Sequence, residues 1–145
     1  NMGHKNENRH KDDNSNSETK ELLKKIKKNK KIKVHYLLSN KGDGFCRLYG
    51  IKKSKDKYIA FIDSDDIWNK NKLLFQYNFI IKNNYNFTYT AYTAFKRYNN
   101  SIKEWKIFPK KKFDFNSFIK DTSIATSSMM INKEIIKKNK IIQLT

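Results

Sequence analysis

The stretch from Lys57 to Trp68, KYIAFIDSDDIW, places a cluster of acids directly after an apolar run. Its first part, Tyr58 to Ile62, is a short continuous apolar run, which predicts a strand buried on both faces of a largely parallel sheet. Three carboxylates follow within four residues: Asp63, Asp65 and Asp66. Their mutual repulsion in a partly dry cleft is costly unless a cation or hydrogen-bond donors compensate it. We therefore predict a metal-binding edge at the carboxyl end of this strand, where open α/β sheets bind their ligands.

The rest of the chain alternates between helical and extended patterns, which predicts an α/β fold. Apolar residues at helical spacing within residues 69–82 predict a helix whose core-facing stripe is Leu73, Leu74, Tyr77, Ile80 and Ile81. Ile32, Val34 and Tyr36 alternate with polar residues that include His35, so this strand is expected to expose His35. Further extended segments are predicted over 87–95 and 124–131, with a loop or edge hairpin over 96–112.

A glycine-rich turn leads into another expected helix near residue 45. Asn40, Gly42 and Gly44 form the turn signal. The apolar face of the helix is supplied by Phe45, Leu48, Tyr49 and Ile51. A turn of this kind at a helix N-terminus suits the approach of a phosphate group.

The composition bounds the function classes. The 145 residues fit one domain, and the formal charge of +18 comes almost wholly from lysine. We interpret this charge mainly as the background of an A/T-rich coding sequence, and it also favours peripheral contact with the anionic inner face of a membrane. The single cysteine, Cys46, suits a reducing compartment. No apolar run approaches the roughly 20 residues of a membrane span, so a cytoplasmic location is expected.

The N-terminal region divides at residue 11. Residues 1–11 are polar and aperiodic, which predicts a disordered segment before a domain over 12–145. Ser15 and Glu18 have the spacing of a capping box, so a helix is expected over about residues 16–28. A helix cap does not explain the paired acids Asp12 and Asp13 that precede it.

Four motifs in order resemble the family 2 glycosyltransferases. They are DDNS from Asp12, the Asn40-Lys41-Gly42 turn with Arg47 after it, DSDDIW from Asp63, and a Thr-Ser-Ser stretch within 124–131. The resemblance implies a partial, Rossmann-like GT-A domain with a mostly parallel central sheet flanked by helices.

The resemblance also implies roles for individual residues. Asp13, Arg47, Asp63 and Asp65 match positions that bind the nucleotide sugar, and Asp65 or Asp66 matches the ligand of a Mn²⁺ or Mg²⁺ ion. The donor implied is a nucleotide-diphosphate sugar, commonly a UDP-sugar, and the acceptor is a glycan or a lipid-linked sugar, as in polysaccharide biosynthesis.

Two parts of the family pattern have no match in this chain. They are the first nucleotide-binding strand with its helix and the later region that supplies the catalytic base, so no catalytic residue is assigned. An inactive fragment or one half of a split enzyme would explain this.

Two alternatives stay open. A lysine-rich nucleic-acid-binding protein without catalytic activity would explain the charge and the aromatic residues, but it leaves the three carboxylates unexplained. A metal-dependent nucleotidyl or phosphoryl transferase also uses clustered acids.

Overall fold

The structure is a computed structural model of the chain, and it describes residues 8–12, 17–114, 116, 120 and 123–138. The chain forms two compact units, Asn1–Lys55 and Asp56–Thr145. The range 12–145, predicted from the sequence as one domain, spans parts of both units.

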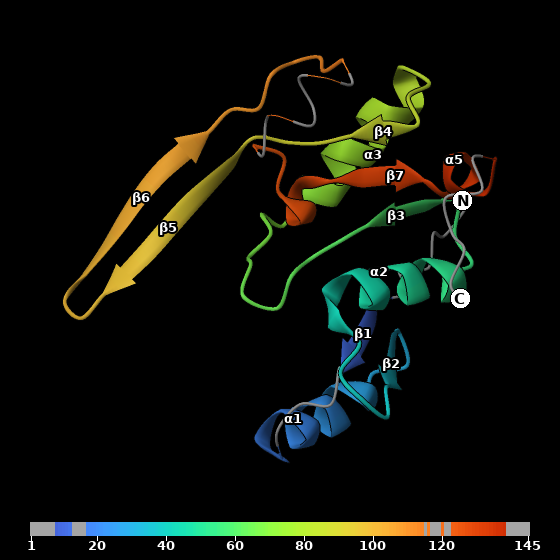
Figure 1. Cartoon of the computed structure of the whole chain (residues 1–145), viewed down its shortest axis with the longest axis vertical. Coiled ribbons are helices and arrows are strands. Elements are labelled where there is room, and N and C mark those ends of the chain that lie inside the picture. The colour runs from blue at the N-terminus through green and yellow to red at the C-terminus, as the bar shows by residue number, and fades with distance from the viewer. Residues whose placement is uncertain (1–7, 13–16, 115, 117–119, 121–122, 139–145) are drawn as a thin grey trace. The chain divides into compact units, whose positions relative to one another are not determined.

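The first unit contains two strands and two helices: β1 (Asn8–Asp12), α1 (Ser17–Lys27), β2 (Ile32–Tyr36) and α2 (Gly42–Lys53). β1 and β2 pair in parallel, with Asn8 opposite Ile32 and Asp12 opposite Tyr36. Figure 1 shows them side by side. The sequence predicted disorder over residues 1–11, but residues 8–11 belong to β1. Strand pairing satisfies the backbone groups whatever the side chains, so a polar segment can form a strand that hydropathy does not reveal.

β2 differs from its predicted alternation. Tyr36 is 43% exposed, whereas His35 is half-buried and its ring meets that of Tyr49 edge-on, with 5.7 Å between the ring centroids. Ile32 and Val34 are half-buried and Lys33 is exposed, as predicted, so the alternation fails only at His35 and Tyr36, where the Tyr49 ring of α2 packs against His35. The predicted glycine turn is present before α2: Gly42 has a φ of +76°, and its N–H donates to Asn40 Oδ1 at 2.9 Å.

The second unit is built around a three-stranded sheet of β3 (Tyr58–Ala60), β7 (Met130–Asn132) and β4 (Phe87–Thr88). β7 lies between the other two strands and is antiparallel to both, as Figure 1 shows. The predicted mostly parallel sheet is thus limited to β1 and β2 among the described pairs. An apolar run reports burial but not the direction of its neighbour, and β3 is a half-buried edge strand of this sheet.

The helix α3 (Lys72–Lys82) supplies the centre of the core of this unit, because Ile80 is fully buried. The predicted stripe is only partly correct: Leu74 and Ile81 are 59% and 47% exposed, and Gln76 is buried instead. The helix ends in a Schellman motif. Asn84 has a φ of 52°, and the N–H of Tyr85 donates to the carbonyl of Ile80 at 3.0 Å.

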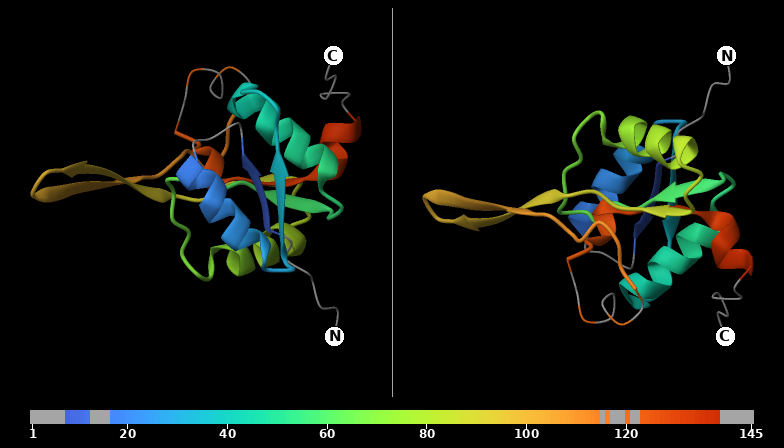
Figure 2. Two further views of the ribbon diagram at one scale, coloured as in Figure 1. Left: turned by 90° about the horizontal axis from the view of Figure 1, so that it is seen from below. Right: turned by 90° about the horizontal axis from the view of Figure 1, so that it is seen from above.

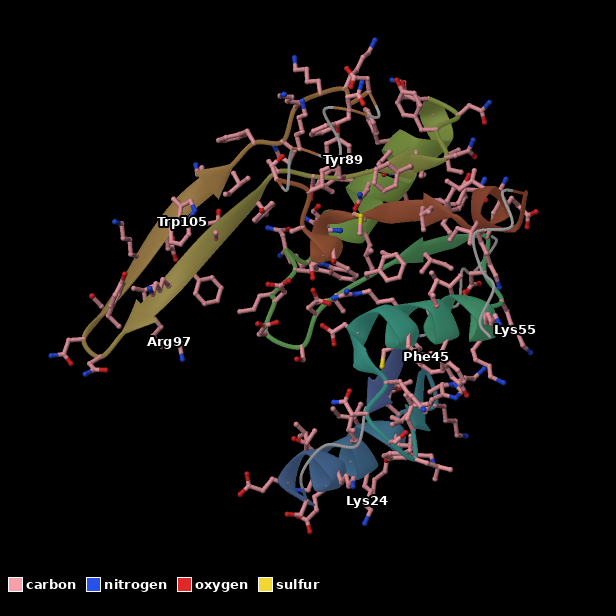
Figure 3. The ribbon with its side chains drawn as sticks, in the orientation of Figure 1. Lys24, Phe45, Lys55, Tyr89, Arg97 and Trp105 are labelled. Carbon is pink, nitrogen blue, oxygen red and sulfur yellow. The ribbon has the colours of Figure 1, made fainter. Side chains whose placement is uncertain are left out.

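The remaining elements are a hairpin and a short C-terminal helix. β5 (Tyr92–Tyr98) and β6 (Ser101–Ile107) form a two-stranded antiparallel sheet, which both views in Figure 2 show extending away from the β3–β7–β4 sheet. Trp105 lies on β6 (Figure 3), and its side chain is 44% exposed. The 3₁₀ turn η1 (Thr126–Ser128) precedes β7, and α5 (Lys133–Lys138) follows it directly. The sequence predicted a loop or edge hairpin over 96–112, but the hairpin begins at Tyr92, within the segment predicted as a strand over 87–95.

Candidate functional site

The residues Asp63–Trp68, here named the acidic segment, follow β3 at its carboxyl end. The N–H of Asp66 donates to the carbonyl of Asp63 at 3.2 Å, which closes a turn. Asp63 is half-buried, whereas Asp65 and Asp66 are exposed. Within the described part of the chain, the carboxylates of Asp65 and Asp66 take part in no ion pair. One turn therefore brings the three predicted carboxylate residues together and leaves two of them available to a ligand.

A buried serine from the other end of this unit contacts the acidic segment twice. Ser127 Oγ accepts the backbone N–H of Asp63 at 2.9 Å, and the Ser127 carbonyl accepts Trp68 Nε1–H at 2.8 Å. Ser127 lies in η1 and is 6% exposed. The sequence placed this residue in a buried strand. The only signal that pointed to it was the Ser/Thr-rich stretch itself.

Lys72, at the start of α3, packs beside the segment. Its Nζ lies 4.6 Å from the centroid of the Trp68 ring and donates to Gln76 Oε1 at 2.7 Å. Burial lowers the pKa of Lys72 from 10.5 to about 8. The Trp68 face and the amide oxygen favour the charged ammonium and so oppose this effect of burial.

The two other predicted site residues belong to the first unit. Arg47 is half-buried in α2, and its Nη2 lies 3.8 Å from Oδ2 of Asp43, one helical turn earlier. Since the Asp43 side chain is 87% exposed, this pair contributes little to stability and does not lock the guanidinium in place. Asp13 lies outside the described residues. Asp63, Asp65 and Asp66 therefore belong to one turn of the second unit, whereas Arg47 belongs to the first unit.

The donor set of the acidic segment fits a hard divalent cation. Among the described residues, no group of three or more His, Cys, Asp or Glu side chains converges to form a complete protein site. Mg²⁺ and similar ions are commonly held by one or two carboxylates together with substrate phosphates, and Asp65 and Asp66 supply that number. The segment therefore suits a metal that binds together with a phosphate-bearing ligand.

None of the helices in the described residues combines the length and the apolar character that a membrane span requires.

Three relatives have clear sequence similarity to the chain. It is 40% identical over 105 residues to an uncharacterized glycosyltransferase of Rickettsia bellii, covering 68% of this chain and 15% of that protein. It is 34% identical over 103 residues to the Escherichia coli UDP-Glc:alpha-D-GlcNAc-diphosphoundecaprenol beta-1,3-glucosyltransferase WfgD, covering 69% and 40%. It is 29% identical over 124 residues to the putative teichuronic acid biosynthesis glycosyltransferase TuaG of Bacillus subtilis, covering 85% and 49%. The chain spans less than half the length of each of these relatives.

Solved structures share the fold. The Staphylococcus aureus protein TarS, residues 1–349, superposes with a TM-score of 0.65 at 24% identity, over 92% of this chain and 39% of TarS. The same protein in complex with UDP gives a TM-score of 0.65 at 22% identity. This similarity shows the α/β GT-A fold. The family model described as glycosyl transferase family 2 matches residues 11–139, so the chain belongs to this family.

Proposed function

We propose that this protein is a metal-dependent glycosyltransferase that transfers a sugar from a UDP-sugar to a glycan or lipid-linked acceptor. The observation that carries the proposal is the acidic segment at the carboxyl end of β3, inside the range matched by the family model. The name of the E. coli relative, a UDP-glucose-dependent transferase acting on a diphosphoundecaprenol-linked sugar, supports this donor and acceptor class.

Each predicted site residue has a role in this proposal. Asp65 or Asp66 would hold Mn²⁺ or Mg²⁺, and Asp63 would contact the ribose or hold the segment in shape. Asp13 and Arg47 would contact the nucleotide and the diphosphate, since a guanidinium pairs with phosphate through two hydrogen bonds. When bound, the divalent cation neutralises charge on the leaving diphosphate. We place these residues in a GT-A domain over 12–145.

The exposure of Asp65 and Asp66 suits this role. Two exposed carboxylates are already solvated, so they exchange water for a cation without the cost of opening a buried site. Their mutual repulsion falls when a cation binds, which couples metal affinity to both residues. A donor that carries its own phosphates adds the remaining ligands.

The proposal includes contact with the cytoplasmic face of a membrane. A net charge of +18 is attracted to anionic headgroups, and a lipid-linked acceptor would be presented at that surface.

Titration calorimetry of UDP into the purified chain tests the proposal. We expect binding in Mn²⁺ or Mg²⁺ that disappears in EDTA and falls below detection in the double variant Asp65→Ala plus Asp66→Ala. The control Asp56→Ala plus Glu104→Ala removes two exposed acids from the same unit and so matches the change in charge. It should bind as the wild type does.

UDP binding that depends on neither the metal nor the acid pair would contradict the proposal. If the chain does not bind UDP but binds RNA with an affinity that falls as salt is raised, the nucleic-acid alternative would be favoured instead.

A further inference from the structure

Ser127 contacts both ends of the acidic segment. Its hydroxyl oxygen accepts from the backbone of Asp63, the first residue, and its carbonyl accepts from the indole of Trp68, the last residue. The four residues between these ends are all exposed. The segment is therefore an exposed turn whose two ends are fixed to one buried residue.

Ser127 is itself held firmly. Gln76 Nε2 donates to the carbonyl of the next residue, Ser128, at 3.0 Å and also lies 3.2 Å from the carbonyl and the hydroxyl of Thr88. Both Gln76 and Ser128 are buried. Buried polar groups that are fully bonded rigidify their surroundings, so η1 forms a stable anchor for the segment.

We propose that Ser127 is a positioning residue that holds the carboxylates of the acidic segment in the geometry required for the metal-bound donor. This inference rests on the proposed function. Like charges at Asp63, Asp65 and Asp66 favour an opened loop when no cation is present. Fixing both ends opposes that opening and reduces the ordering cost of binding.

The two contacts can be removed separately. Ser127→Ala deletes the acceptor for Asp63 N–H but keeps the carbonyl that accepts from Trp68. Trp68→Phe deletes the indole donor and keeps an aromatic ring beside Lys72. The matched control is Ser128→Ala, which removes a neighbouring buried hydroxyl that bonds within its own turn and does not touch the segment.

Amide hydrogen exchange measured by NMR tests the anchor without any ligand. In Ser127→Ala we expect the Asp63 amide to exchange about threefold to tenfold faster, the range that corresponds to one lost hydrogen bond. In Trp68→Phe we expect faster exchange across residues 64–67 with Asp63 still protected. Ser128→Ala should leave both regions unchanged. Unchanged exchange in Ser127→Ala and Trp68→Phe would overturn the inference.

Titration of UDP with Mn²⁺ tests the positioning role. We expect Ser127→Ala to weaken UDP binding by about threefold to tenfold. Ser128→Ala should bind UDP as the wild type does, even if its melting temperature falls as much as that of Ser127→Ala. The effect of Ser127→Ala on UDP affinity should be smaller when Asp65→Asn is also present, because both substitutions act on the same proposed metal site. Faster exchange with unchanged UDP affinity would overturn the positioning role.

The two experiments separate this inference from the proposed function. Failure of the wild type to bind UDP would refute the donor site. The exchange rates would then decide by themselves whether Ser127 holds the segment.

Discussion

The β3–β7–β4 sheet and the β5–β6 hairpin belong to one unit and are stabilised in different ways. The strands of the sheet are two or three residues long, and buried polar side chains such as Gln76, Ser127 and Asn132 connect them to the surrounding turns. The hairpin strands are seven residues each with an unbroken register, but most of their side chains are exposed. Regular backbone pairing is therefore found mainly in the hairpin, and side-chain burial mainly around the sheet. The acidic segment follows a strand of the sheet.

The largest expected difference between the two regions comes from truncating one isoleucine in each. Ile80→Ala empties a fully buried position and should lower the free energy of unfolding by about 3 kcal/mol. Ile102→Ala in the hairpin, where the side chain is 56% exposed, should change it by less than about 0.5 kcal/mol. Urea denaturation of both variants measures the contrast. Equal losses would show that the hairpin is packed as tightly as the sheet.

A smaller effect should appear at high pH, through Lys72. Its pKa is about 8 in the folded protein and 10.5 otherwise, so between these values the unfolded chain binds a proton that the folded chain lacks. Stability rises with pH wherever the unfolded state binds more protons. The wild type should therefore gain stability relative to Lys72→Met as the pH rises from about 8 to 10.5.

Urea denaturation of both proteins at a series of pH values checks this. Parallel curves for wild type and Lys72→Met would mean that the Trp68 face and Gln76 fully offset the effect of burial.

The smallest effect should come from the hairpin. Lys96 and Lys103 lie directly opposite each other across β5 and β6, and like charges in this arrangement are destabilising. Lys103→Glu replaces the repulsion with an attraction and should raise stability by about 0.5 kcal/mol. Thermal unfolding in low salt measures the gain, which should shrink in high salt. Lys110→Glu, outside the strands, controls for the change in net charge and should not reproduce the full gain.

The sequence was informative where chemistry is local. Three carboxylates after an apolar run mark the acidic segment by themselves. A capping box placed α1, and helical periodicity placed α3, each within a few residues of its bounds. The contact between Asp63 and Ser127 joins residues 64 positions apart, and no local pattern encodes it. Gln76 was missed for a related reason, because a polar residue is assigned to the exposed face of a helix unless its distant partners are known.

The direction of strand pairing was also beyond local patterns. Tyr58–Ala60 has the composition of a strand in a parallel sheet, yet its neighbour β7 arrives from the opposite direction after the turn at η1. The polar strand β1 was not predicted, because it is extended through pairing with β2 and its own residues show no strand pattern.

The end of α3 shows how the residue type at one position can set where a helix stops. Asn84 adopts a left-handed conformation that glycine usually takes after a helix, and asparagine is one of the few other residues that accept it. Because most residues that carry a Cβ pay a steric cost in this conformation, the point at which α3 ends depends on the residue type at this single position.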